Sequence, residues 1–99
     1  MRISLLVAAC LLAAPVQAHA QDAVARSLAA TCANCHGTDG KSATRDVVPL
    51  AGLPKEHIVT QMKAFKDGTR QATVMHQLAK GYTDQQIDLM AAYFAAQKR

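Results

Sequence analysis

The chain has little of the material from which a small protein usually builds its core. Among 99 residues there is no Trp, and there are only two Tyr and two Phe. A domain of this size buries only about 60% of the surface of its unfolded chain and often depends on a metal, a disulfide or another staple. The shortage of large side chains therefore indicates that something other than the protein itself fills the centre.

Two further absences exclude whole classes of structure and function. No stretch shows the alternation of apolar and polar residues that is typical of strands. The formal net charge of +4 is mild, and no basic stripe interleaved with aromatic residues is present, so nucleic-acid binding is not expected. The simplest interpretation of the scattered lysines is a solvated surface, and a positive rim for a docking partner is the alternative. These lysines are Lys41, Lys55, Lys63, Lys66 and Lys80.

The amino-terminal segment has the pattern of an export signal. Arg2 is followed by an apolar run over residues 3–14 and then by the small-residue sequence "AHA", which ends at Ala20. The run is about a dozen residues long, whereas a bilayer-spanning helix needs roughly 20. The sequence therefore predicts a cleaved signal peptide over residues 1–20 and one domain over residues 21–99, with no membrane span after cleavage.

Two alternatives to cleavage after Ala20 remain open. The sequence "VQA", which ends at Ala18, is a second possible cleavage site. The sequence "VAAC" around Cys10 loosely resembles a lipoprotein box, but the apolar region before this cysteine is short. We therefore expect a secreted chain and not a lipid-anchored one.

Helical periodicity and capping residues predict an all-α domain of three or four short helices. Ala25, Leu28, Ala29 and Cys32 share one face of the first helix, and their small size predicts a close crossing with another helix. Gly68 is a candidate carboxyl-terminal cap. The expected helices cover about residues 22–32, 54–67, 73–80 and 83–97, with a polar loop over residues 37–52.

The last of these helices carries the clearest local signals. Thr83 and Gln86 have the spacing of a capping box, in which each side chain binds a backbone N–H of the other residue. The apolar residues that follow recur at the spacing of one helix face. They are Ile87, Met90, Ala91 and Phe94.

The sequence "CANCH" presents Cys32, Cys35 and His36 together, and three kinds of chemistry use such a cluster. A redox dithiol is expected within a βαβ framework, which this chain lacks. A structural zinc site needs four ligands, usually as two pairs, but residues 37–99 contain no cysteine, and His57 and His76 are 19 residues apart. C-x-x-C-H is also the attachment sequence for c-type haem.

Haem attachment explains the most observations. Two thiols bond to the two vinyl groups on one edge of the macrocycle, and the next residue presents an imidazole to the iron. Export agrees with this interpretation, because the attachment takes place on the outer side of the bacterial membrane. A large apolar haem would also supply the missing core. The sequence therefore predicts one covalent haem c on Cys32 and Cys35, with His36 as the proximal iron ligand.

The chain resembles the class I c-type cytochromes over nearly all of residues 21–99. The resemblance rests on a helix leading into "CANCHGTDGKS", a "PLAG" loop, a methionine-bearing loop and a last helix ending in "AAYFAAQ". "LAATCANCHG" and "FKDGTRQATVMHQLAKGYTDQQI" are most similar to the small single-haem cytochrome subunits of flavocytochrome c sulfide dehydrogenases. The resemblance implies the class I cytochrome c fold around one haem.

The second axial ligand determines what the haem can do, since an open position would bind small molecules. Met62 and Met90 lie on apolar helix faces and are expected in the core, and His57 is expected to be exposed. Met75 follows the irregular stretch "DGTRQATV", from which a thioether can cross the haem face, and the family resemblance places the axial methionine at this position. Met75 is therefore the predicted distal ligand, with His76 as the second candidate.

The resemblance also implies that a loop carbonyl accepts a hydrogen bond from the ring of His36. In the family this carbonyl belongs to a proline, so Pro49 is the first expectation. Pro49 directly precedes Leu50, however, where relatives usually have one residue between, so Val48 is the alternative.

The expected function is periplasmic electron transfer without a catalytic residue of the chain's own. The resemblance implies a flavoprotein that oxidises sulfide as the redox partner. A free-standing carrier that donates to a terminal oxidase or another redox protein is the first alternative. A haem enzyme or gas sensor with an open axial position is the second, and it predicts rapid carbon monoxide binding by the ferrous protein.

Overall fold

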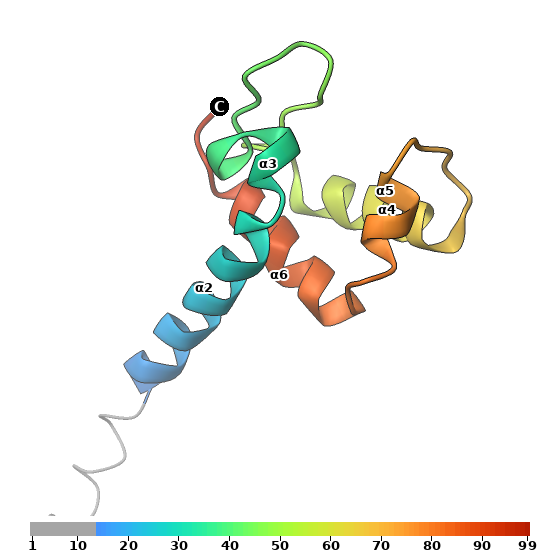
Figure 1. Ribbon diagram of the computed structural model, residues 1–99. Coiled ribbons are helices and arrows are strands. Elements are labelled where there is room, and N and C mark those ends of the chain that lie inside the picture. Colours follow the sequence, from blue (N-terminus) through green and yellow to red (C-terminus); the bar gives the residue numbers. More distant parts are fainter. Residues whose placement is uncertain (1–13) are drawn as a thin grey trace, which may run out of the picture.

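The computed structural model of the chain describes residues 14–99, and every regular element in this range is helical (Figure 1). The all-α prediction is therefore confirmed for this part of the chain. Most of the predicted signal, including Arg2 and Cys10, lies outside the described residues. No helix within residues 14–99 combines the length and apolarity that a bilayer crossing requires. In chain order the elements are α2 (Ala14–Ala30), α3 (Ala33–His36), the 3-10 turn η2 (Thr38–Gly40), α4 (Lys55–Asp67), α5 (Met75–Ala79) and α6 (Asp84–Ala95).

Helix α2 begins eight residues before the expected start at Asp22. Its sequence is rich in alanine and contains no glycine, and Pro15 lies in the first turn, where proline is tolerated. At the other end, the backbone N–H of Cys32 still donates to the carbonyl of Ala29 at 3.0 Å. The chain thus turns directly from α2 into the short helix α3.

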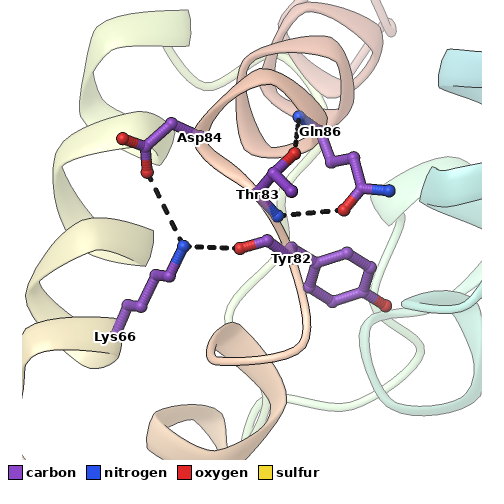
Figure 2. Close-up of polar contacts among 5 residues, drawn as sticks. All are labelled: Lys66, Tyr82, Thr83, Asp84 and Gln86. Atoms are coloured by element: carbon purple, nitrogen blue, oxygen red, sulfur yellow. Dashed lines mark hydrogen bonds and ion pairs between the residues drawn. The ribbon is translucent and has the colours of Figure 1, made fainter.

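The ends of α4 and α6 follow the predicted capping signals. Pro54 is the residue before α4, and Gly68 ends it in the left-handed region at a φ of +86°. At the start of α6, the backbone N–H of Gln86 donates to Thr83 Oγ1 at 3.1 Å, and the backbone N–H of Thr83 donates to Gln86 Oε1 at 2.9 Å. Figure 2 shows this reciprocal pair, so the predicted capping box is confirmed.

The core forms where α2, α4 and α6 meet, and it is thin. Ala29, Ile58, Ala91 and Phe94 form one buried cluster, which confirms the predicted close crossing of α2 and α6. The four residues predicted for the inner face of α6 are all buried. Among the described residues, Ile87 is the largest side chain that is completely buried.

The loop between η2 and α4 is attached by backbone hydrogen bonds to the end of η2 and to α6. The N–H groups of Leu50 and Ala51 both donate to the carbonyl of Gly40, at 2.9 and 3.1 Å. The N–H of Gly52 donates to the carbonyl of Phe94 at 2.9 Å. These contacts fix the end of the loop that contains Val48.

Two of the five lysines that could form a positive rim make ion pairs or hydrogen bonds within the protein. Lys55 Nζ lies 2.9 Å from Asp88 Oδ1. Lys66 Nζ lies 3.7 Å from Asp84 Oδ1 and donates to the carbonyl oxygen of Tyr82 at 2.6 Å (Figure 2). Lys41, Lys63 and Lys80 are exposed.

Candidate functional site

The cluster Cys32, Cys35 and His36 lies on a single helical turn. Cys32 precedes the first residue of α3, and the backbone N–H of His36 donates to the carbonyl of Cys32 at 2.9 Å. Residues three and four apart on a helix lie on the same side. The turn therefore gathers the two thiols and the imidazole at one end of α2.

The ring of His36 is oriented by the backbone of the loop that follows. His36 Nδ1 lies 2.7 Å from the carbonyl oxygen of Val48, and since a carbonyl only accepts, Nδ1 carries the hydrogen. The first expectation, Pro49, was wrong, and the alternative residue Val48 supplies the oxygen. With Nδ1 protonated, the Nε2 lone pair is available to a metal ion, and the hydrogen bond fixes the orientation of the ring.

Gly37 lets the backbone leave His36 in a direction that other residues would not permit. Its φ is +83°, and a Cβ at this position would lie only 2.1 Å from the carbonyl oxygen of Lys41. A side chain here would collide with the backbone of the loop. Gly37 thus does more than form a simple turn, since it allows the loop that carries Val48 to fold back over His36.

The two cysteines of the cluster are free thiols, and they differ in exposure. Cys32 is half-buried and Cys35 is exposed. Burial raises the pKa of the Cys32 thiol above its ordinary value, with a smaller effect of the nearby Cys35, while the polar contact with the Thr31 hydroxyl acts in the opposite direction. Both sulfurs are therefore available for thioether formation, with Cys35 the more accessible of the two.

Met75 is the first residue of α5, directly after the irregular stretch that the sequence predicted. Its side chain is half-buried. Helix α5 packs against α4, whereas α3 packs against η2 near the carboxyl end of α6. Figure 1 accordingly shows α3 and α5 on separate parts of the molecule.

The other candidate ligands occupy the positions expected of them. Met90 is buried, and Met62 is half-buried against the core cluster. His57 is exposed. The second candidate, His76, lies next to Met75 in α5, and its Nδ1 is buried without a hydrogen-bond partner within the described part of the chain.

The donor atoms and their surroundings fit a c-type haem. Over residues 14–99, no group of three or more His, Cys, Asp or Glu side chains is arranged to hold a metal ion by itself. Val48, Val74 and Leu78 are large apolar side chains that are more than half exposed. Val48 lies beside the His36 ring, and the other two flank Met75 in sequence. A flat apolar macrocycle would cover such side chains and complete the thin core.

Sequence reasoning missed one residue near this site. The Tyr82 hydroxyl lies 2.8 Å from Oγ1 of Thr31, which is the residue before Cys32. The two residues are 51 positions apart, so no local pattern joins them. Phe94, which was predicted for the inner face of the last helix, lies with Ala29 of α2 in the core cluster.

Comparison with known proteins agrees with this geometry. The family model for cytochrome c matches residues 21–98. The cytochrome subunit of sulfide dehydrogenase from Chlorobaculum tepidum is 48% identical over 68 residues, which cover 68% of this chain and 60% of that protein. A cytochrome c4 from Pseudomonas aeruginosa is 40% identical over 76 residues, which cover 77% of this chain and 38% of that protein.

A solved structure gives the same result for the fold. The cytochrome c4 of Acidithiobacillus ferrooxidans superposes with a TM-score of 0.63 at 38% sequence identity, over 66% of this chain and 37% of that one. The chain thus spans about three fifths of the length of the sulfide dehydrogenase subunit and less than two fifths of the two cytochromes c4.

Proposed function

The chain belongs to the cytochrome c family of electron carriers, which bind haem c, and on that premise we propose that it accepts electrons in the periplasm from a flavoprotein that oxidises sulfide. The observation that carries the choice of partner is the 48% identity to a cytochrome subunit of sulfide dehydrogenase. The proposal concerns the partner and the compartment.

Four side chains hold the haem in this proposal. The Cys32 and Cys35 sulfurs would form the two thioether bonds, and His36 Nε2 would bind the iron. The hydrogen bond from His36 Nδ1 to the Val48 carbonyl supports this role, because it fixes the ring and leaves Nε2 unprotonated. Met75 would be the second iron ligand, through its thioether.

The bound haem supplies an iron that alternates between Fe(III) and Fe(II) and so carries one electron. The Met75 thioether is a soft ligand that favours the reduced iron, which raises the reduction potential relative to two histidine ligands. His36, whose ring N–H donates to the Val48 carbonyl, would be a stronger electron donor to the iron and would act in the opposite direction. With His36 and Met75 both bound, the haem would transfer electrons and would offer no open iron position to a substrate.

The attachment is tested by the mass of the purified chain. The parent should carry the mass of one haem that denaturation and acidified solvent do not remove. Cys32→Ala and Cys35→Ala should each leave one thioether, and the double variant should release its haem in acidified solvent. A double variant that retained covalent haem would contradict the assignment of the two thiols.

The partner is tested by reduction of the ferric protein under anaerobic conditions. With a flavoprotein sulfide dehydrogenase present, sulfide should reduce the haem much faster than sulfide alone does, because electrons pass from sulfide through the flavin. A reaction without flavoprotein and one without sulfide are the controls. If the flavoprotein does not accelerate reduction above the sulfide-only rate, the proposed partner is wrong.

The compartment is tested by the same mass measurement on protein from a periplasmic extract. We expect a chain that begins after Ala20 or after Ala18, with one haem added. A haem-bearing chain that retained residues 1–18 would contradict cleavage of the proposed signal.

A further inference from the structure

Tyr82 connects three parts of the molecule from the turn between α5 and α6. Its backbone N–H donates to the carbonyl of Ala79 at 3.2 Å. Its carbonyl oxygen accepts the hydrogen bond from Lys66 of α4, and its ring points away from Lys66 (Figure 2). Its hydroxyl lies 2.8 Å from Thr31 Oγ1 at the end of α2. A single residue thus joins the segment after α5 to both α4 and α2.

The hydrogen bond between Tyr82 and Thr31 has a defined direction. Thr31 Oγ1 donates its only hydrogen to the carbonyl of Leu28 at 2.8 Å. The Tyr82 hydroxyl must therefore be the donor to Thr31 Oγ1. Because Thr31 immediately precedes Cys32, this bond reaches the backbone that carries the proposed haem thioethers.

The chain from Val74 to Tyr82 forms one hydrogen-bonded unit, with Met75 near its start. Within this unit, backbone N–H groups donate to carbonyls three or four residues earlier, at 3.0 to 3.2 Å. The N–H groups of Gln77 and Leu78 donate to the carbonyl of Val74, that of Gly81 to Leu78, and that of Tyr82 to Ala79. A contact that restrains Tyr82 therefore restrains Met75 at the other end of the same short unit.

Lys66 alone does not supply this restraint. It attaches Tyr82 to α4, and α4 already packs against α5, so this contact adds no direct link between the unit 74–82 and the segment before Cys32. The Tyr82 hydroxyl, in contrast, links the unit that carries Met75 directly to the segment before Cys32 and His36. The two axial ligands lie on the two parts that this bond connects.

We propose that Tyr82 is a positioning residue that keeps Met75 on the haem iron by donating a hydrogen bond to Thr31. The inference rests on the proposed role of Met75 as the distal ligand. Removing the Met75 thioether from the iron requires the unit 74–82 to move away from the haem-attachment segment. The Tyr82–Thr31 bond opposes that movement.

Imidazole provides a probe, since it binds ferric iron at the distal position only when Met75 has left. The apparent dissociation constant is then the intrinsic constant divided by the fraction of protein in the open state. A hydrogen bond contributes about 1 kcal/mol net, which corresponds to a factor of about five in that fraction. Ferric Tyr82→Phe should therefore bind imidazole about fivefold more tightly than the parent, while still showing the weak red absorption of methionine ligation without imidazole.

Variants of the partner and of the second tyrosine complete the experiment. Thr31→Val should show at least the same gain in imidazole affinity, since it also removes the local bond to the Leu28 carbonyl. Adding Tyr82→Phe to it should give little more, because both changes remove the Tyr82–Thr31 bond. Thr31→Ser, which keeps the hydroxyl, should bind imidazole as the parent does. Tyr93→Phe removes a hydroxyl that donates to Asp39 of η2, outside the unit 74–82, and should leave the affinity unchanged.

The outcomes separate this inference from the proposed haem ligation. Equal imidazole affinities in the parent and Tyr82→Phe would refute the positioning role alone, as would fully additive effects of Tyr82→Phe and Thr31→Val. An equal gain in Tyr93→Phe would show that general loosening, not this bond, sets the affinity. If Met75→Ala had the same spectrum as the parent, Met75 would not be the iron ligand, and the positioning role of Tyr82 would be refuted as well.

Discussion

Gly40 lies in the turn after His36, where the chain has no space for a side chain. Its φ is +77°, and a Cβ would lie 2.8 Å from the Ala51 backbone nitrogen, 2.8 Å from Phe94 Cδ1 and 2.9 Å from Leu50 Cβ. The left-handed conformation costs a residue other than glycine about 1–2 kcal/mol, and overpacking in a well-packed region costs about 1–3 kcal/mol. Gly40→Ala should therefore lower the free energy of unfolding by about 2–5 kcal/mol.

Gly68→Ala separates the two contributions to this loss. Gly68 has a similar φ of +86°, but nothing lies within 4 Å of the Cβ position. The substitution there should cost only the backbone strain, about 1–2 kcal/mol. The difference between the two variants then measures the collision at Gly40.

Guanidinium unfolding of the ferric holoprotein, followed by circular dichroism, gives both free energies if the slopes agree among variants. The Gly40 carbonyl also holds Leu50 and Ala51, so a displaced turn should move the Val48 carbonyl away from His36. An imidazole that has lost this hydrogen bond donates less electron density and stabilises ferric iron less, so the reduction potential of Gly40→Ala should rise. If Gly40→Ala and Gly68→Ala lose the same stability, the close packing inferred at Gly40 is wrong.

Three further predictions concern α6. Phe94→Ala empties the centre of the core cluster, because Phe94 is only 3% exposed. The substitution should lower the free energy of unfolding by about 3–5 kcal/mol in the same measurement. A loss below about 1 kcal/mol would show that the haem alone supports the core. Thr83→Ala removes the capping box and should cost about 1 kcal/mol, and adding Gln86→Ala should cost little more; independent, additive losses would contradict the reciprocal cap. Donation to the Asp39 carboxylate raises the pKa of Tyr93, so this bond contributes fully below the ordinary phenol pKa of about 10 and is lost as the pH rises through the raised value. The free energy of unfolding should therefore fall less between pH 9 and 11 (about one unit on either side of that pKa) in Tyr93→Phe than in the parent, and equal falls would exclude this contribution.

Local features of the fold could be predicted because each depends on a few neighbouring residues. The capping box of Thr83 and Gln86 depends only on the spacing of these two residues. The cap at Gly68 depends only on the ability of glycine to adopt the left-handed conformation. The inner face of α6 follows from helical periodicity, and its buried residues were all identified. The start of α2 was placed too late, because an alanine-rich segment has no signal for where a helix begins.

Contacts between distant segments could not be predicted in this way. The acceptor for His36 depends on how the loop folds back after Gly37, and one residue of difference in loop length exchanges Pro49 for Val48. The bond between Tyr82 and Thr31 joins residues 51 positions apart, and neither has an unusual neighbour. The composition did show that the core is too thin, because the number of large apolar side chains in a chain does not depend on where they stand in the sequence.

The axial ligation of the iron is tested most directly by the red absorption of the ferric holoprotein. Met75→Ala is compared with the parent, and His76→Ala serves as the matched control from the adjacent position. The parent and His76→Ala should both show the weak red absorption of methionine-ligated haem, and Met75→Ala should lose it and bind carbon monoxide rapidly once reduced. A Met75→Ala protein that kept the parent spectrum, or a His76→Ala protein that lost it, would contradict Met75 as the ligand that makes this chain an electron carrier.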